Sequence, residues 1–275
     1  MTPFRKMHGL GNDFVVFDAR EKSLALSDTQ VRKLADRHFG VGCDTVVVMG
    51  PGGAAADASL LFYNADGGDA EACGNATRCV ARLLMDERGL VRVKLASRTG
   101  LLHCQDMGKG QVAVDMGAPK LDWAQIPMSQ QTDTKEFALT IEDSRLDASA
   151  VSMGNPHCVL FVPDAEEAPV MALGPRIEKL PLFPERVNVE FASIAAPDRI
   201  RMRVWERGVG ITLACGTGAC ATAVAAMRRG MTGRKVEVVL DGGSLLLEWR
   251  EDDHVWMTGP AATPFTGEVD LAKYS

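Results

Sequence analysis

The chain has 275 residues, of which 46% are apolar and 24% are charged, a composition that excludes a disordered, collagen-like or long coiled-coil protein. This length favours two domains, each large enough to bury its own core, over a miniprotein held by disulfides. Thirty basic and 36 acidic residues give a net charge of −6. The basic residues are scattered, so we expect no nucleic-acid partner.

The apolar runs and the cysteines indicate the compartment. No apolar run approaches the ~18 residues of a membrane span, and the N-terminal segment MTPFRKMHGLGNDF lacks the apolar core of a secretory signal. We therefore expect a cytoplasmic protein with no membrane partner. Seven cysteines, an odd number, then predict reduced thiols.

Short β-branched runs separated by Gly, Pro or Asp predict strands throughout the first half of the chain. They lie at residues 14–17, 45–49, 91–95 and 112–114. Between the second and third runs, CGNATRCVARLLMDERG predicts a helix that ends at Gly89. Gly117, Pro119 and the polar stretch 129–136 then interrupt the pattern, which predicts a first domain of residues 1–118.

The second half, residues 119–263, repeats this organisation. Its predicted strands lie at 159–162, 187–191, 200–204, 236–240 and 244–249. Its helix, CGTGACATAVAAMRRG, carries Arg228 and Arg229 in the last turn before Gly230. The helix is small and apolar, so we expect it to be buried on most sides. After Pro264 the chain is expected to return to the first domain with residues 264–275. Each half is thus mostly β with one central helix, an α+β fold.

Two sequence matches at nearly the same offset indicate an internal duplication. GNDFVVF in the first half resembles GNPHCVLF in the second, which aligns Asn12 with Asn155. FYNADGGDAEACG lies over VWERGVGITLACG, which aligns Cys73 with Cys215. Each copy therefore supplies one Gly-Asn turn and one Ala-Cys-Gly element that leads into a helix.

The paired Ala-Cys-Gly elements suggest acid/base chemistry. A cysteine at the first residue of a helix meets unpaired N–H groups and the positive end of the helix dipole, which lower its thiol pKa. The same amides bind anions, and here they belong to Gly74, Asn75, Gly216 and Thr217. If the halves face each other across a pseudo-two-fold axis, Cys73 and Cys215 flank one ligand. One thiolate would then remove an α-proton while the other thiol delivers a proton to the opposite face.

Other readings of these motifs are weaker. Five cysteines lack a match under the repeat offset and are expected to be small buried side chains, namely Cys43, Cys79, Cys104, Cys158 and Cys220. The spacings within the pairs Cys73/Cys79 and Cys215/Cys220 are too long for structural zinc, so no metal site is predicted. GTGACA followed by Asp241 fits a dinucleotide-binding fingerprint, but neither half alternates strands with helices as that fold requires.

The motifs GLGNDF, DGGDAEACGNATRC, MGNPH and WERGVGITLACGTGACA together resemble the diaminopimelate epimerase family, from Asn12 to past Ala221. The resemblance implies an isomerase that interconverts LL- and meso-2,6-diaminopimelate without a cofactor, in lysine and peptidoglycan precursor biosynthesis. It also implies the fold: two pseudo-symmetric domains, each a mostly antiparallel β-sheet wrapped around a central α-helix, with the active site in the interdomain cleft. The family further suggests a homodimer.

The resemblance also implies roles for single residues. Cys73 and Cys215 match the acid/base pair, and Gly74, Asn75, Gly216 and Thr217 match the positions that bind the carboxylate at the reacting centre. The side chains that would read the substrate's amino and distal carboxylate groups are Asn12, Asn64, Asn155, Asn188 and Arg207. Glu206 would accept from the substrate ammonium and, with His157, tune the thiol pKa values.

This chain departs from the family pattern at four positions. Thr45, which the repeat offset aligns with Asn188, stands where Gln is common, so we expect at most a water-mediated contact with substrate. Gly68 replaces a serine and Ala76 replaces a glycine, and neither change removes a group that the mechanism needs. Trp205 replaces a tyrosine, which we interpret as a packing variation.

Two other classes of function remain open from the sequence. A proline racemase or hydroxyproline epimerase can use paired thiols, but its substrate lacks the distal amino-acid head that Arg207 and the asparagines are expected to read. A thiol redox protein or a non-catalytic amino-acid binding protein is the other alternative. Exchange of the substrate α-hydrogen in deuterated water, without added cofactor, separates an epimerase from both.

Overall fold

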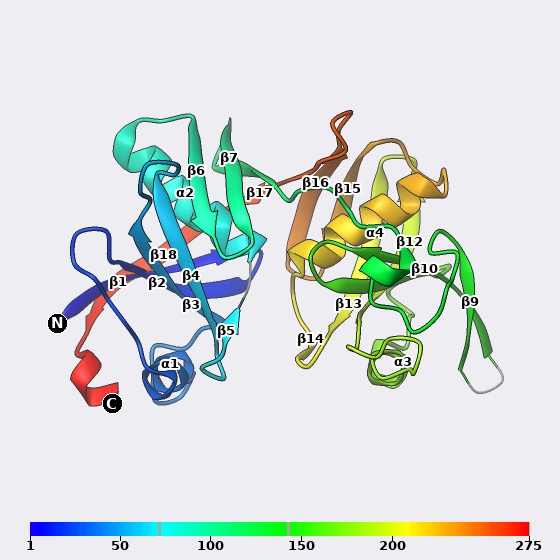
Figure 1. The fold of residues 1–275 in the computed structure, drawn as a ribbon, viewed down its shortest axis with the longest axis horizontal. Helices are drawn as coiled ribbons and strands as arrows, with labels where there is room; N and C mark the ends of the chain where they lie inside the picture. The colour runs from blue at the N-terminus through cyan, green and yellow to red at the C-terminus, as the bar shows by residue number, and fades with distance from the viewer. Residues whose placement is uncertain (71–72, 142–143, 275) are drawn as a thin grey trace. The chain divides into compact units, whose positions relative to one another are not determined.

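The structure, a computed structural model, describes residues 1–70, 73–141 and 144–274. Two compact units make up the chain: unit 1 comprises Met1–Asp115 and Thr258–Ser275, and unit 2 comprises Met116–Met257 (Figure 1). The predicted boundaries at 118/119 and 263/264 lie a few residues later. At the division two connections pair as strands, since Met116 N–H donates to Val255 and Val255 N–H donates to Gly117, both at 2.9 Å. The chain therefore leaves and re-enters unit 1 in extended backbone, before the Gly and Pro residues on which the predicted boundaries rest.

Unit 1 is built on a mostly antiparallel sheet. Its strands are β1 (Thr2–Gly9), β2 (Asn12–Asp18), β3 (Thr45–Pro51), β4 (Ala58–Asn64), β5 (Asp69–Ala70), β6 (Arg92–Ser97), β7 (Gly100–Gly108), β8 (Gln111–Asp115) and β18 (Ala262–Val269). Only the β2–β3 and β4–β6 pairs are parallel among the described pairings of this unit. Its helices are α1 (Asp28–Ala35), α2 (Gly74–Arg88) and the short 3-10 helix η2 (Leu271–Tyr274).

Unit 2 repeats this arrangement. Its strands are β9 (Phe137–Ile141), β10 (Ser144–Ser152), β11 (Pro156–Phe161), β12 (Asn188–Ala196), β13 (Arg199–Glu206), β14 (Gly210–Ile211), β15 (Lys235–Leu240), β16 (Gly243–Trp249) and the first part of β17 (Val255–Pro260). The β11–β12 and β13–β15 pairs are the parallel ones among its described pairings. Its helices are η1 (Trp123–Gln125), α3 (Val170–Ile177) and α4 (Gly216–Arg228).

The duplication extends to strand register. In unit 1 Phe14 lies opposite Thr45 across β2 and β3, and in unit 2 His157 lies opposite Asn188 across β11 and β12. The second pair follows the first by the same offset that aligns Asn155 with Asn12. Because register sets which side chains share a face of a sheet, the two units present equivalent positions in equivalent places. The predicted two-domain repeat is confirmed.

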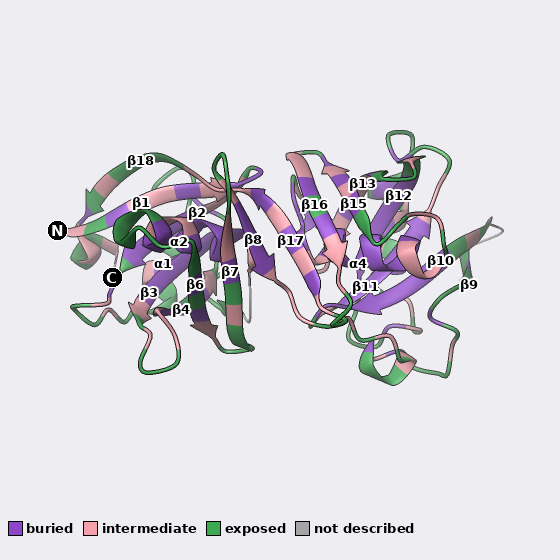
Figure 2. Ribbon diagram, turned by 90° about the horizontal axis from the view of Figure 1, so that it is seen from above, coloured by how far each residue is buried: buried purple, intermediate pink, exposed green. Residues whose placement is uncertain are grey.

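The predicted central helices are present, and they are buried as expected. Ten of the 13 residues of α4 are buried, and Figure 2 shows this helix almost wholly in the buried colour. α4 contacts the strands β10 to β13, β15 and β16, and its small side chains permit that close packing. α2 ends at the C-cap Gly89, whose φ of 65° is left-handed and favours glycine. The glycine that the sequence analysis placed at the end of this helix therefore does end it.

One short helix in each unit was not predicted. α1 and α3 have eight residues each, and they begin at equivalent positions of the repeat. Ser27 caps α1 in a capping box with Gln30, a pattern visible in the sequence as SDTQ. Two turns of helix give too few apolar positions for a clear 3.6-residue period, and α3 contains Pro175 and lacks a side-chain cap.

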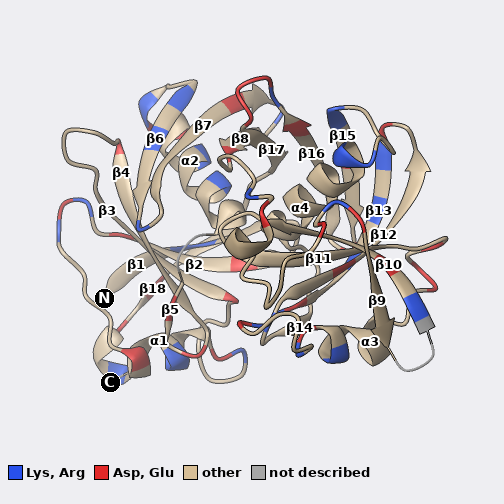
Figure 3. Cartoon of the chain, turned by 45° about the vertical axis from the view of Figure 1, so that its right-hand side comes forward, with Lys and Arg blue, Asp and Glu red and all other residues tan. Residues whose placement is uncertain are grey.

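The surface carries both signs of charge. Figure 3 shows acidic and basic residues scattered over strands and loops of both units. Within the part of the chain that the structure describes, no helix is long and apolar enough to cross a membrane.

Candidate active site

The two matched cysteines occupy the same structural position in their units. Cys73 is the N-cap of α2 and Cys215 is the N-cap of α4, one residue before the helical position that the sequence predicted. The Ala76 N–H donates to the Cys73 Sγ at 3.5 Å, and the Gly218 N–H donates to the Cys215 Sγ at 3.4 Å. Each thiol therefore faces the amides of a helix N-terminus, as a capping serine would.

In unit 1 the Asn12 side chain lies beside the Cys73 thiol. Its Oδ1 accepts from Asn75 Nδ2 at 3.1 Å and lies 3.8 Å from the Cys73 Sγ. A tight hairpin brings Asn12 there: β1 and β2 pair from Gly9 to Asn12 around a turn whose second residue, Gly11, has a φ of 84°. Three predicted site residues, Asn12, Cys73 and Asn75, thus meet at the first turn of α2.

A charged network fixes the Asn12 amide. Its Nδ2 donates to Asp44 at 2.9 Å, and Arg37 bridges Asp44 and Asp13 at 2.7 and 2.8 Å. Burial alone would raise the pKa of Asp13, but hydrogen bonds and charge from Arg37 and Lys6 lower it to about 2. Because Asp44 is an acceptor, the Asn12 oxygen is left pointing toward Cys73 and Asn75.

Thr45 and Asn64 lie opposite each other on β3 and β4. Thr45 is 7% exposed, whereas Asn64 is exposed at the end of β4. The turn after Asn64 is closed by its N–H donating to Gly68 and by the Gly67 N–H donating to Asn64. Their contacts with a substrate stay predictions, and residues 71 and 72 of the same motif lie outside the described residues.

Unit 2 repeats the asparagine contact. Asn155 Nδ2 lies 3.3 Å from the Thr217 hydroxyl, and that hydroxyl lies 3.6 Å from the Cys215 Sγ. His157 contacts Asn155 Oδ1 through Nε2 at 3.0 Å and Glu190 through Nδ1 at 2.7 Å. Four predicted residues and Glu190 therefore form a continuous set of contacts that ends at the thiol.

Asn188 connects the Arg207 backbone to the strand that carries His157. The buried Asn188 donates through Nδ2 to the Pro156 carbonyl and accepts from the Arg207 N–H through Oδ1, both at 2.9 Å. The Arg207 guanidinium donates to the Glu185 carbonyl at 3.1 Å and keeps further N–H donors. Asn188 thus holds the Arg207 backbone, and direct substrate contacts of both side chains stay predictions.

The charge environment of Cys215 differs from the one expected. Burial raises the pKa of this thiol well above 9.0, and the nearby Glu206 and Glu190 carboxylates raise it further, against the lowering effect of hydrogen bonds from Thr217 and Gly218. The expectation of a lowered pKa is wrong for Cys215 in this conformation. The thiol is only 5% exposed, and its desolvation raises the pKa more than the hydrogen bonds at the helix N-terminus lower it. The surroundings of Cys215 therefore favour its neutral thiol form.

Glu206 also has an altered pKa. Burial raises it, against the lowering effects of hydrogen bonds with Thr212 and Cys215 and of the charge on His157. The Thr212 hydroxyl donates to Glu206 Oε1. The raised pKa of this carboxyl next to a thiol marks Glu206 as a candidate functional group.

The remaining cysteines are structural. Cys43, Cys79, Cys104, Cys158 and Cys220 are reduced thiols with at most 2% exposure, as predicted. Burial raises the pKa of Cys43, Cys79 and Cys104 to about 12. Among the described residues no group of three or more His, Cys, Asp or Glu side chains is placed to hold a metal ion.

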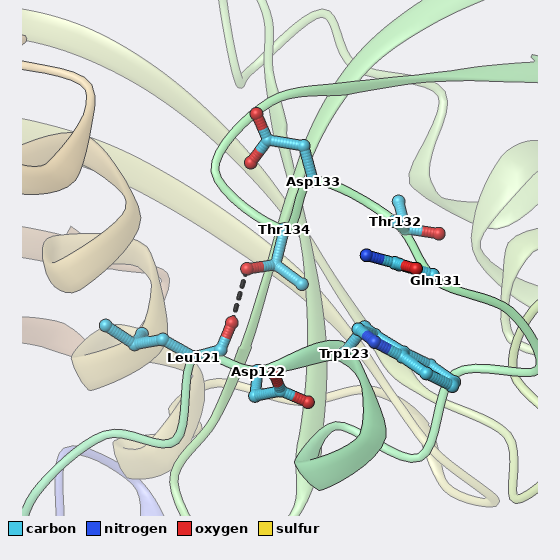
Figure 4. Close-up of a pocket in the computed structure, with 7 residues that line it drawn as sticks. All are labelled: Leu121, Asp122, Trp123, Gln131, Thr132, Asp133 and Thr134. Atoms are coloured by element: carbon cyan, nitrogen blue, oxygen red, sulfur yellow. Dashed lines mark hydrogen bonds between the residues drawn. The ribbon is translucent and has the colours of Figure 1, made fainter.

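A pocket of about 380 Å³ lies in unit 2, apart from the predicted residues (Figure 4). It is lined by Leu121, Asp122, Trp123, Gln131, Thr132, Asp133 and Thr134. Asp122 caps the backbone of Ala124, Asp133 caps that of Lys135, and the Thr134 hydroxyl donates to the Leu121 carbonyl. These polar groups serve the local turns, and the residues that line the pocket include none of the predicted site residues.

Sequence reasoning missed three residues that contact the site. They are Asp44 beside Asn12, Thr212 beside Glu206, and Glu190 beneath His157. For Glu190 a signal existed: it is the one acid within the apolar run 187–191, two residues after Asn188 and so on the same face of its strand. The contacts of Asp44 and Thr212 depend on loop geometry and had no such signal.

Comparison with known proteins identifies the family. The family model for diaminopimelate epimerase matches residues 4–121 and 149–264. A diaminopimelate epimerase of Rhodospirillum centenum is 54% identical over 97% of this chain and 91% of its own, and one of Acidiphilium cryptum is 51% identical over 98% and 97%.

Solved structures share the fold at low sequence identity. A probable proline racemase from Agrobacterium radiobacter, solved with bound carbonate, has a TM-score of 0.70 at 16% identity, covering 98% of this chain and 93% of that one. This likeness concerns the fold alone. The family model and the close relatives cover nearly the whole chain, and the chain therefore belongs to the diaminopimelate epimerase family.

Proposed function

We propose that this protein is an isomerase that interconverts LL- and meso-2,6-diaminopimelate, with Cys73 and Cys215 as its two acid/base groups. The observation that carries the proposal is the matched placement of both thiols as N-caps of the two central helices. Cys73 lies beside Asn12, and Cys215 is joined to Asn155 through the Thr217 hydroxyl. Membership of the family supports the substrate.

The reaction needs one proton removed and one delivered. In one direction the Cys73 thiolate takes the substrate α-proton, which leaves a carbanion, and the Cys215 thiol gives its proton to the opposite face of that carbon. Surroundings that favour a protonated Cys215 thiol suit the delivering role. In the reverse direction the thiols exchange roles, so each turnover leaves the proton on the other sulfur.

Stabilising the carbanion is the hard step, and the helix N-termini supply the means. Negative charge develops on the substrate carboxylate as the α-proton leaves. The N-terminal amides at Gly74 and Asn75 and at Gly216 and Thr217 would donate to it. Each well-aimed donor of this kind is worth ~3 kcal/mol in a site closed to water. Two such helix ends would replace the electron sink that a cofactor provides in other racemases.

Recognition of the distal end would fall to the polar side chains. Arg207 offers a forked donor for a carboxylate. Asn12, Asn64, Asn155 and Asn188 can donate to carboxylate or accept from ammonium. Glu206 would accept a hydrogen bond from an ammonium group of the substrate.

Racemisation of proline or hydroxyproline is the second candidate, favoured by the shared fold. The two activities separate directly. Purified protein is incubated without cofactor with LL-diaminopimelate, L-proline or trans-4-hydroxy-L-proline, and the stereoisomers are resolved by chiral chromatography. We expect the meso isomer from diaminopimelate and no change in the imino acids. Turnover of an imino acid alone, or of none of the three, would overturn the proposal.

We also propose a cytoplasmic homodimer. The seven reduced cysteines are consistent with a reducing compartment, and dimerisation rests on the family resemblance. Light scattering after size exclusion is expected to give twice the chain mass of 29.6 kDa. A mass of one chain would refute the dimer.

A further inference from the structure

A buried carboxylate lies beneath the site of unit 2. Glu190 on β12 and His157 on β11 are both 0% exposed, and Glu190 Oε1 lies 2.7 Å from His157 Nδ1. The other oxygen, Oε2, has no hydrogen-bond partner among the residues that the structure describes. A buried carboxylate with one oxygen unpaired costs folding free energy. Its presence therefore calls for a reason other than stability.

Unit 1 shows that the fold does not require this pair. The repeat offset places Phe14 at the position equivalent to His157 and Val47 at the position equivalent to Glu190, and both are fully buried. Phe14 lies one strand from Val47 in the same parallel β2–β3 arrangement. An apolar pair thus fills the same place in the repeated sheet, and buried ion pairs seldom improve on such packing.

The first turn of α4 is shaped around the carboxylate. A Cβ at Gly218 would lie 2.7 Å from Glu190 Oε1 and 3.2 Å from the Cys215 Sγ, so the absence of a side chain lets the helix approach. The equivalent residue of α2 is Ala76, in the unit that has Val47 in place of the acid. Gly218 and Glu190 therefore form a matched combination, and Ala76 and Val47 form another.

The carboxylate also selects the state of the histidine ring. A carboxylate only accepts hydrogen bonds, so its contact with Nδ1 places a proton on that nitrogen. Nε2 donates in turn to Asn155 Oδ1 at 3.0 Å, since an amide oxygen only accepts. The Asn155 Nδ2 donates to the Thr217 hydroxyl, which lies next to the Cys215 thiol. The orientation of the ring thereby sets the orientation of the amide and the hydroxyl that follow it.

We propose that Glu190 is a positioning residue that holds the His157 ring by accepting from a protonated Nδ1 and, through Asn155 and Thr217, orders the hydrogen bonds around the Cys215 thiol. This proposal rests on the proposed function for its catalytic meaning. Glu190 lies beneath the ring and orients it through Nδ1, and its charge also raises the pKa of the nearby Cys215 thiol. Its removal therefore changes the arrangement of the other groups as well as the charge near the thiol.

The test reads the ring directly. Protein with ¹⁵N-labelled histidine is studied by NMR without substrate, and the variant His157→Phe identifies the His157 signals among those of the five histidines. Wild-type protein is expected to show a His157 Nδ1 proton that exchanges slowly with water. Glu190→Val and Glu190→Leu remove the acceptor and are expected to lose that signal. Two apolar variants are used so that the result does not depend on one of them folding.

Two further variants separate the loss of the hydrogen-bond acceptor from the general effect of changing a buried glutamate. Glu190→Gln keeps an acceptor and is expected to keep the Nδ1 proton signal. The matched control Glu178→Gln alters another buried glutamate of unit 2, which accepts from Trp205 and Gly208, and is expected to leave the His157 signals unchanged. In the diaminopimelate assay, kcat is expected to fall about ten- to a hundredfold in the apolar variants. Where an apolar variant loses more than tenfold, the kcat of Glu190→Gln is expected to be at least tenfold higher than that of the apolar variant.

The outcomes are distinguishable. A slowly exchanging Nδ1 proton that survives in folded Glu190→Val or Glu190→Leu, or that is missing from the wild type, overturns the positioning role. Wild-type protein that does not act on diaminopimelate overturns the proposed function, while the NMR comparison still decides the role of Glu190.

Discussion

The two thiols are equivalent in position and differ in surroundings. Cys73 lies beside an asparagine held by an exposed charged network, whereas Cys215 lies in a buried set with two glutamates and a histidine. Electrostatic asymmetry of this kind gives two chemically identical groups different proton affinities. We infer that one sulfur is prepared to accept a proton while the other is prepared to give one.

Removal of either thiol tests this division. Cys73→Ala and Cys215→Ala are each expected to lower kcat by at least ~10³, since acid/base groups contribute ~10²–10⁴ and both are needed in every turnover. Circular dichroism and the melting temperature are expected to stay near those of the wild type. A variant that keeps more than a tenth of wild-type turnover would rule out its cysteine as a required acid or base.

The Asp13 carboxylate predicts a pH dependence of stability. Its folded pKa of about 2 lies below the ordinary 3.8, a difference that corresponds to about 2 kcal/mol. The group has its pKa lowered by folding, so this stabilisation is present above pH 4 and is lost as the pH falls toward 2. In urea unfolding at pH 7, Asp13→Asn is therefore expected to be less stable than wild type by roughly that amount or somewhat less, since solvent screens the partly exposed pair.

The same comparison at lower pH checks the cause. At pH 3 the difference in unfolding free energy between wild type and Asp13→Asn is expected to be clearly smaller than at pH 7. The reason is that the wild-type carboxylate begins to be protonated there, which weakens its ion pairs. An equal gap at both pH values would mean that the substitution acts through packing and not through the ion pairs with Arg37 and Lys6.

At the scale of the elements, the central helices carry the thiols, and the position three residues after each thiol is Ala76 in α2 and Gly218 in α4. Gly218→Ala is expected to destabilise the protein by ~1–3 kcal/mol, since its Cβ would press on Glu190 and Cys215. Adding Glu190→Val removes the carboxylate and reproduces the Ala76 and Val47 combination of unit 1. The double variant is expected to recover at least about 1 kcal/mol of stability relative to the sum of the two single changes.

A thermodynamic cycle over these variants measures the coupling. Unfolding free energies of the wild type, the two single variants and the double variant suffice. Strictly additive effects would show that Gly218 and Glu190 do not constrain each other. As a reference, Ala76→Gly in α2 is expected to cost only the ~1 kcal/mol of a helical glycine.

The elements were predictable where their signals are local. The helices after Cys73 and Cys215 follow from apolar runs that end at Gly89 and Gly230, and the duplication follows from two matches at nearly one offset. The short helices α1 and α3 gave too little periodicity. The contact of Glu190 with His157 joins residues on neighbouring parallel strands that lie far apart in the sequence, and register of that kind is set by tertiary packing.

At the scale of the whole molecule, the proposal requires both half-sites to act on one substrate molecule. If the thiols approach each other when the site is empty, mild oxidation is expected to form a Cys73–Cys215 disulfide, detected by peptide mass spectrometry after alkylation, with loss of activity that a reductant reverses. Cys79 and Cys220 serve as internal controls because both are fully buried. Oxidised, inactive protein without the 73–215 crosslink would argue against this proximity.

Isotope incorporation in the first turnovers tests the two-thiol mechanism most directly. Wild-type protein is mixed with LL-diaminopimelate in deuterated water. At low conversion the product and the remaining substrate are separated, and the deuterium content of each is measured by mass spectrometry. With separate groups on the two faces, the meso product is expected to carry one solvent deuterium while the remaining LL substrate carries none. Deuterium that enters the remaining substrate as fast as the product would show that a single group removes and returns the proton, and would contradict the account.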